Sequence, residues 1–401
     1  MLTSLAFIFL AGLLMAAVCK RLKLPGMIGM LITGIVLGPY VLDLLDPSIL
    51  SVSSDLRQMA LIIILLKAGL SLDLSDLKKV GRPAIMMSCV PASCEILAFF
   101  LLAPSLLGVT RIEAAVMGAV LAAVSPAVVV PRMVRLMDEK YGTKKSIPQL
   151  ILAGASCDDI FVIVLFSTFS GMAQGGHANV MGFVNIPVSI VLGIALGAAA
   201  GFVLSVFFET SYAHRHCVRN SVKVIIVLGV SFLLMAVETW LKGIVSVSGL
   251  LAVVSMACVI RIRCVPQVTA RLSEKFGKLW LAAEVILFVL VGAAVDIRYT
   301  LEAGIAAVAM IFAALIFRGI GVSLCLVKTS LSFNERLFCI IAYLPKATVQ
   351  AAIGSVPLAM GLPCGKIVLS VAVLAILITA PLGAIGIDSA YKKLLTHDEN
   401  G

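Results

Sequence analysis

One stretch decides the fold: Pro148-Gln-Leu-Ile-Leu-Ala-Gly-Ala-Ser-Cys-Asp-Asp-Ile-Phe-Val-Ile-Val-Leu-Phe-Ser167, in which two adjacent carboxylates, Asp158 and Asp159, stand in an apolar segment. One charged residue at the centre of a membrane helix costs about 2.5–3.5 kcal/mol on insertion scales. Neighbouring side chains on a helix point about 100° apart, so one adjacent helix cannot cover both. We interpret the pair as a membrane site that holds a cation or a proton.

The composition is that of a polytopic membrane protein. Of 401 residues, 61% are hydrophobic and 13% are charged, a balance that excludes a soluble domain. We attribute the net charge of +10 to basic cytoplasmic loops and expect no nucleic-acid partner. The ten cysteines form no C-x-x-C pair, so free thiols are expected. The apolar start, residues 1–18, precedes its basic residues and is interpreted as a retained first span.

Apolar runs predict an all-α membrane protein with about 13 transmembrane helices. The predicted spans lie at about 2–18, 27–45, 58–72, 84–107, 112–135, 147–170, 182–208, 221–238, 243–260, 278–296, 300–327, 333–355 and 364–387.

Charge placement predicts the orientation of these spans. One alternate set of loops contains 23 lysines and arginines, and the opposite set contains 5. The positive-inside rule therefore puts the amino terminus outside and the carboxyl terminus in the cytoplasm. Three basic residues stay inside spans: Lys67, Arg318 and Lys346.

The two halves of the chain share an inverted repeat, a construction frequent in secondary transporters. Gly69-Leu-Ser-Leu-Asp73 recurs as Gly292-Ala-Ala-Val-Asp296, 223 residues later, at the end of a span that crosses the membrane in the opposite direction. Glu95 and Arg318 are also 223 residues apart. Because residues related by a pseudo-two-fold lie at equal depth, we expect these opposite charges to pair.

Prolines interrupt one span in each repeat. Pro126 and Pro131 fall in the fifth predicted span, and Pro345 falls in the twelfth, at an offset of 219 residues from Pro126. Proline removes a helix hydrogen bond, and broken backbone at membrane depth is tolerated where it is buried or lines a cavity. We therefore expect two crossed, broken helices whose ends carry partial charges beside an ion.

Three motifs carry a family resemblance over essentially the whole chain: Ser125-Pro-Ala-Val-Val-Val-Pro131, Gly154-Ala-Ser-Cys-Asp-Asp159 and Leu344-Pro-Lys-Ala-Thr-Val-Gln-Ala-Ala352. They resemble the sodium/hydrogen exchanger 9B (NHA) branch of the cation/proton antiporter superfamily. The resemblance implies exchange of Na⁺ or Li⁺ for protons by alternating access, with no cofactor. It also implies a homodimer in the lipid bilayer, and the short tails suggest a bacterial inner membrane.

The resemblance assigns roles to single residues. Asp159 would be the main cation and proton site, where Na⁺ binds, and Asp158 the neighbouring carboxylate, paired with Lys346 when no cation is bound. Glu95 and Arg318 match an intramembrane ion pair of the same branch.

Two serines are further candidate cation ligands. Ser156 lies three residues before Asp159 on roughly the same helix face, and Ser125 lies at the predicted break. Hard oxygen donors of this kind suit Na⁺ or Li⁺.

The predicted organisation alternates scaffold and transport spans. Residues 1–75 and 221–297 would form a dimerisation scaffold, residues 84–170 and 300–387 the two core transport repeats, and residues 182–208 a linker helix.

Other functions explain fewer of these residues. A sodium-coupled organic-anion symporter would need an anion site, which two adjacent carboxylates disfavour. An intramembrane aspartyl protease would carry its aspartates on separate helices, so we expect no enzyme. A channel would need a filter of repeated carbonyl rings, and none is visible. K⁺/H⁺ exchange remains an alternative, because sequence does not fix cavity size. Proton stoichiometry also stays open.

Overall fold

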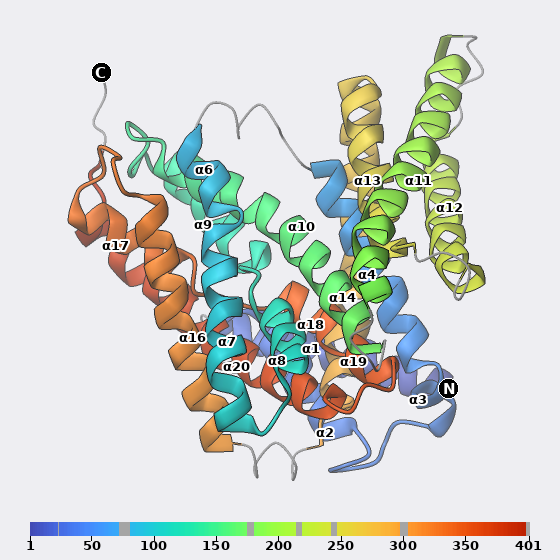
Figure 1. Ribbon diagram of the computed structural model, residues 1–401, viewed down its shortest axis with the longest axis horizontal. Helices are drawn as coiled ribbons and strands as arrows, with labels where there is room; N and C mark the ends of the chain where they lie inside the picture. Colours follow the sequence, from blue (N-terminus) through green and yellow to red (C-terminus); the bar gives the residue numbers. More distant parts are fainter. Residues whose placement is uncertain are drawn as a thin grey trace. The chain divides into compact units, whose positions relative to one another are not determined.

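The computed structural model describes residues 1–22, 24–71, 81–174, 180–213, 219–241, 247–296 and 304–397, which fold as helices joined by short connections (Figure 1). The helices are α1 (Leu2–Arg21), α2 (Gly26–Leu37), α3 (Pro47–Ser51), α4 (Ser53–Ser71), α6 (Arg82–Met87), α7 (Val90–Leu107), α8 (Arg111–Leu121), α9 (Pro126–Asp138), α10 (Ile147–Gln174), α11 (Val180–Ala213), α12 (Asn220–Trp240), α13 (Gly249–Arg263), α14 (Pro266–Ala293), α16 (Gly304–Cys325), α17 (Phe333–Ala342), α18 (Thr348–Gly354), α19 (Val356–Ala359) and α20 (Gly365–Leu394).

The predicted all-α membrane fold is confirmed, but the count of 13 spans is not. Among the described residues, nine helices or helix pairs are long and apolar enough to cross a membrane. The other four predicted spans correspond to shorter, charged or broken helices. α2 has 12 residues and α13 has 15, α4 carries three charged side chains, and the span at 333–355 is divided between α17 and α18.

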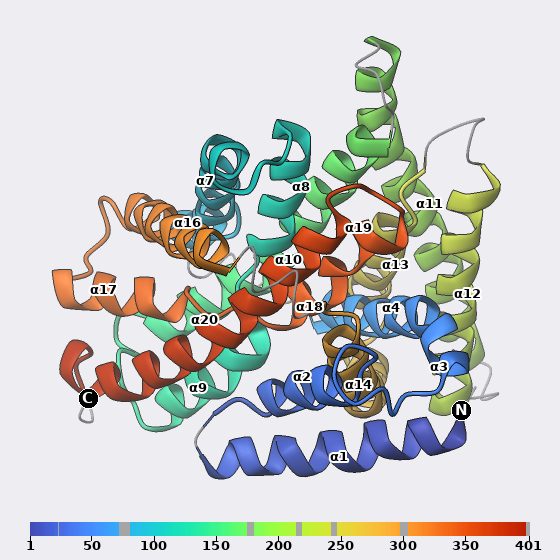
Figure 2. The same cartoon turned by 90° about the horizontal axis from the view of Figure 1, so that it is seen from below.

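The chain divides into two compact units. One contains Met1–Arg57, Asp73–Val162 and Val285–Gly401, and the other contains Gln58–Leu72 and Ile163–Glu284. In the first unit, α1 packs along α2 and α7 packs along α16 (Figure 2). In the second unit, α13 packs against α11 and α12 (Figure 1). All the candidate site residues belong to the first unit.

Local sequence signals fix where the two broken helices begin. Thr110 and Glu113 form a capping box at the start of α8, and Ser332 and Glu335 form another at the start of α17. Each pair satisfies two backbone donors that a helix start leaves free. Lys145 lies 2.8 Å from the Glu335 carboxylate and adds an ion pair at the second cap.

The breaks themselves follow from the prolines. The first covers residues 122–125 and ends where Pro126 opens α9, and the second covers residues 343–347 around Pro345. The two breaks touch, because the backbone N–H of Ser125 donates to the carbonyl of Pro345 at 2.8 Å. Pro131, in contrast, does not break the helix, because α9 continues through it. In the turn beside this proline, the Arg132 guanidinium donates to the Val128 carbonyl at 2.9 Å.

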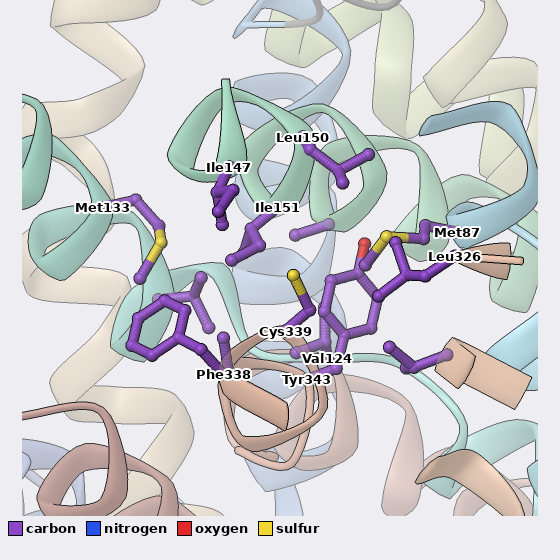
Figure 3. Close-up of a cluster of buried hydrophobic side chains, with 14 of the residues drawn as sticks. Met87, Val124, Met133, Ile147, Leu150, Ile151, Leu326, Phe338, Cys339 and Tyr343 are labelled. Carbon is purple, nitrogen blue, oxygen red and sulfur yellow. The ribbon is translucent and has the colours of Figure 1, made fainter. Parts of the chain in front are cut away.

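Between the breaks and the first residues of α10 lies a buried apolar cluster (Figure 3). It gathers side chains from α6, α9, α10, α17 and both breaks, including Met87, Met133, Ile147, Leu150, Ile151, Phe338, Tyr343 and Val124. Tyr343 is fully buried in it, and a Cβ at Gly154 of α10 would overlap the Tyr343 hydroxyl. Close packing of this kind holds the second break against α10, one turn before Asp158.

Candidate functional site

Five charged side chains meet in the interior of the first unit, and we call them the buried charge cluster: Glu95 of α7, Asp158 and Asp159 of α10, Arg318 of α16 and Lys346 of the second break. Each is at most 7% exposed, and Glu95, Asp158 and Arg318 are completely buried. Charges so fully desolvated persist only when they are paired with opposite charges or hydrogen-bonded.

Glu95 lies between the two cations of the cluster. Its Oε2 atom lies 2.8 Å from Arg318 Nη1 and accepts from Lys346 Nζ at 2.8 Å, and its Oε1 atom lies 2.7 Å from the same Nζ. The structure thus places Glu95 and Arg318 in contact across 223 residues of sequence.

Asp158 pairs with Arg318, not with Lys346. Its Oδ2 atom accepts from Arg318 Nη2 at 3.1 Å and from the backbone N–H of Val124 at 2.8 Å. This differs from the expected Lys346–Asp158 contact. The physical reason lies in Lys346 Nζ, which has three oxygen atoms around it, two from Glu95 and the Leu121 carbonyl at 2.6 Å. Two of these oxygens, Glu95 Oε2 and the Leu121 carbonyl, accept hydrogen bonds from Nζ, and the whole Glu95 carboxylate balances its charge.

Side-chain N–H groups of Arg318 and Lys346 satisfy the backbone carbonyls that the first break leaves without a helix hydrogen bond. In a continuous helix the Ala122 carbonyl would accept from residue 126, which is a proline without an N–H. Arg318 Nη1 supplies that donor instead, and Arg318 Nε donates to the Tyr343 carbonyl at 2.6 Å in the other break. Arg318 therefore binds both breaks and two carboxylates with one planar guanidinium, a use for which lysine lacks the geometry.

Four buried oxygen atoms at the cluster make no hydrogen bond among the described residues: Glu95 Oε1, which still lies 2.7 Å from Lys346 Nζ, and Asp158 Oδ1, Asp159 Oδ1 and Ser125 Oγ. The oxygens of Asp158, Asp159 and Ser125 belong to neighbouring residues. Asp159 follows Asp158 in α10, and Ser125 follows Val124, whose backbone N–H donates a hydrogen bond to Asp158. Ser125 precedes α9, yet its hydroxyl makes no cap hydrogen bond. A buried oxygen without a partner costs free energy. The oxygens of Asp158, Asp159 and Ser125 are therefore suited to act as ligands of a hard monovalent cation. Ser156 lies in α10, and its side chain is outside the described residues.

Sequence reasoning missed one residue that the structure brings to the cluster. Gln350 of α18 is fully buried, and its side chain joins the two breaks. The signal in the sequence was weak: a single polar residue in an apolar run, four positions after Lys346. Two of the three backbone groups that Gln350 contacts, the Leu121 and Ala123 carbonyls, are more than 220 residues away, which no spacing rule indicates.

Comparisons with known proteins identify the family. The family model for the transmembrane sodium/hydrogen exchanger matches residues 5–392. Sodium/hydrogen exchanger 9B2 from Homo sapiens is 34% identical over 390 residues, which cover 94% of this chain and 71% of the relative. Sodium/hydrogen exchanger 9B1 from Homo sapiens is 32% identical over 394 residues, 93% of this chain and 73% of the relative.

A solved structure shows the same fold. The sodium proton antiporter MjNhaP1 from Methanocaldococcus jannaschii superposes with a TM-score of 0.81 at 22% identity, covering 98% of this chain and 99% of that one. The family resemblance drawn from the three motifs is therefore confirmed. The chain belongs to the sodium/hydrogen exchanger family, and it is an integral membrane exchanger of monovalent cations for protons.

Proposed function

We propose that this chain exchanges Na⁺ or Li⁺ for H⁺ at Asp159, with Asp158 and Ser125 as further oxygen ligands. The observation that carries the proposal is the set of three buried oxygens without a partner among the described residues, Asp158 Oδ1, Asp159 Oδ1 and Ser125 Oγ. Oxygen donors select hard cations over soft ones. Ser156 stays a proposed ligand from its spacing to Asp159 alone.

Charge balance in the buried charge cluster supports a single monovalent substrate. Three carboxylates and two cations leave a net charge of −1 when all five groups are ionised. A buried net charge is costly, and either one Na⁺ or one H⁺ at Asp159 neutralises it. Competition between these two ions for one carboxylate is sufficient for exchange.

The same count favours one proton for each cation. Lys346 is held by three oxygen atoms and is not paired with Asp158, so arrival of Na⁺ at the aspartates does not displace its partner. Electroneutral exchange follows, and release of a second proton from Lys346 would require that this contact break.

The organic-anion alternative is disfavoured by the same contacts. An anion site at the buried charge cluster would need a free cation there, but Arg318 and Lys346 both bind carboxylates within the cluster. The choice between Na⁺, Li⁺ and K⁺ is a matter for measurement, and K⁺/H⁺ exchange stays the second candidate.

Alternating access is proposed as a movement of the transport repeats, residues 84–170 and 300–387, against a scaffold of residues 1–75 and 221–297 linked by residues 182–208. We also propose a homodimer in a bacterial inner membrane, with the amino terminus outside and the carboxyl terminus in the cytoplasm. The observation behind the orientation is the excess of basic residues in one set of loops.

The test uses purified protein in liposomes with an imposed pH gradient and a pH-sensitive dye inside. Na⁺, Li⁺ and K⁺ are added in turn to wild type, to Asp159→Asn and to a control, Asp43→Asn, at an exposed loop position. We expect Na⁺- or Li⁺-driven proton movement in wild type and in the control, and none in Asp159→Asn. Substantial transport by Asp159→Asn would remove Asp159 as the essential site.

A second arm of this experiment tests the stoichiometry. Valinomycin and K⁺ set the membrane potential while Na⁺-driven proton movement is recorded. Electroneutral exchange predicts a rate that does not change with the potential. A rate that increases when the potential is made favourable for net charge movement would show that more than one proton moves for each cation.

A further inference from the structure

We infer that Gln350 is a positioning residue that locks the two helix breaks together and sets the cation affinity of the site; this rests on the proposed function. Its amide makes three hydrogen bonds. Oε1 accepts from the Ala347 N–H at 2.8 Å, and Nε2 donates to the Ala123 carbonyl at 2.7 Å and to the Leu121 carbonyl at 3.4 Å. Ala347 starts α18, whereas Leu121 and Ala123 lie at the end of α8 and in the first break.

Gln350 contacts the backbone of residues 121–124, and the same segment makes hydrogen bonds to three charged side chains. The Leu121 carbonyl accepts from Lys346, and the next carbonyl accepts from Arg318. Two residues further on, the Val124 N–H donates to Asp158. A shift of this short segment would therefore move both cations and one aspartate together. Gln350 touches none of the reacting atoms and acts through the backbone.

The position requires a neutral group with an acceptor on one side and two donors on the other. Among side chains of this length, glutamine alone combines these in one planar group. Glutamate can replace the acceptor, but its second oxygen donates only when it is protonated. When ionised it would face two carbonyl oxygens and add a negative charge to the network around Lys346, Arg318, Glu95 and Asp158.

Two substitutions separate the hydrogen bonds from the space that the side chain fills. Gln350→Met keeps the volume and removes every donor and acceptor. Gln350→Glu restores the donor at acid pH only. Gln267→Glu, at an exposed position near the start of α14, is the matched control for the change of glutamine to glutamate.

Initial rates of Na⁺-driven proton movement give the apparent KM for Na⁺ and the maximal rate at about pH 6 and about pH 9. We expect Gln350→Met to raise KM roughly tenfold at both pH values, because two buried backbone groups lose their partners, with a smaller change in maximal rate. Gln350→Glu should match wild type at the lower pH and should depart from wild type at the higher pH, where its ionised carboxylate no longer donates to the two carbonyls. The control should match wild type throughout.

Several outcomes would overturn the inference. A KM for Gln350→Met within a factor of about two of wild type would show that the bonds are dispensable. A Gln350→Glu variant with no change in its ratio to wild type between the two pH values would show that donation to the carbonyls is not required. This second comparison uses only Gln350→Glu and wild type, so it holds even where Gln350→Met fails to fold.

A readout that needs no transport distinguishes this inference from the proposed function. Na⁺ bound to the native state raises Tm. We expect Na⁺ to raise the Tm of wild type more than that of Gln350→Met. A wild type that is stabilised by Na⁺ but moves no protons refutes the exchange function and still allows Gln350 to be tested. Equal stabilisation of both proteins at every Na⁺ concentration refutes the role of Gln350.

Discussion

Replacing Glu95 with glutamine removes the carboxylate that both cations of the buried charge cluster contact. Glu95 lies 2.8 Å from Arg318 Nη1 and 2.7 Å from Lys346 Nζ, and all three side chains are at most 1% exposed. At an effective dielectric constant of about 20, a pair at this distance attracts by roughly 6 kcal/mol before the cost of desolvation is subtracted. Loss of one partner of a buried pair costs about 3–5 kcal/mol in measured cases. We expect Glu95→Gln to lower the free energy of unfolding by about 3–5 kcal/mol.

The substitution also changes the charge of the site. The cluster goes from a net charge of −1 to zero with Asp159 ionised, so an entering cation no longer neutralises it. We therefore expect Glu95→Gln to lose Na⁺ stabilisation and most exchange. Adding Lys346→Met removes the stranded ammonium and returns the net charge to −1. The double variant should recover stability, with a coupling energy of at least about 2 kcal/mol, and should regain part of its response to Na⁺.

Unfolding in mixed micelles with increasing SDS, with and without Na⁺, measures both quantities for the four proteins of this double-mutant cycle. The liposome assay then shows whether Na⁺ binding and exchange follow the charge count. Two results would refute the reasoning. One is a Glu95→Gln protein within about 1 kcal/mol of wild type. The other is a double variant whose loss equals the sum of the single losses, because then the two groups do not interact.

Three other substitutions test separate contacts. Gly154→Ala should destabilise the protein by about 1–3 kcal/mol, since its Cβ would overlap the Tyr343 hydroxyl; adding Tyr343→Phe should recover part of the loss in the same SDS titration. Gly383→Ala would place its Cβ on the Pro345 ring and should impair exchange by displacing the second break; normal rates in liposomes would contradict this. Ser125→Ala removes a hydroxyl without a partner among the described residues, so it should leave the free energy of unfolding unchanged within about 0.5 kcal/mol while raising the KM for Na⁺; an unchanged KM would exclude Ser125 as a ligand.

Much of the fold was predictable because it depends on local sequence. Apolar runs identified most of the spans, and Pro126 and Pro345 identified the two breaks, because a proline supplies no N–H to the helix turn before it. Proline alone was not sufficient, since α9 continues through Pro131. The span count was less predictable. Helices such as α2 and α13 are too short to meet a length criterion, and apolar composition alone does not show where a helix stops.

At the site, the residue types were predictable and one contact was not. Charged residues in apolar segments are visible in any sequence, so Asp158, Glu95, Arg318 and Lys346 could all be identified as candidates. Symmetry also indicated that Glu95 and Arg318 lie at equal depth. The expected contact between Lys346 and Asp158 came from family resemblance, and the structure has Lys346 on Glu95 instead.

The sequence by itself determined the class of protein, the two broken helices and the presence of charged residues of both signs at membrane depth. These are properties of composition and local backbone chemistry. Only the tertiary structure decided that Asp158 pairs with Arg318 and Lys346 with Glu95, and that Gln350 bonds to the backbone of the other repeat. Those contacts join residues 160 to 251 positions apart. They depend on which faces of distant helices pack together, and that choice is made by the packing of the whole first unit.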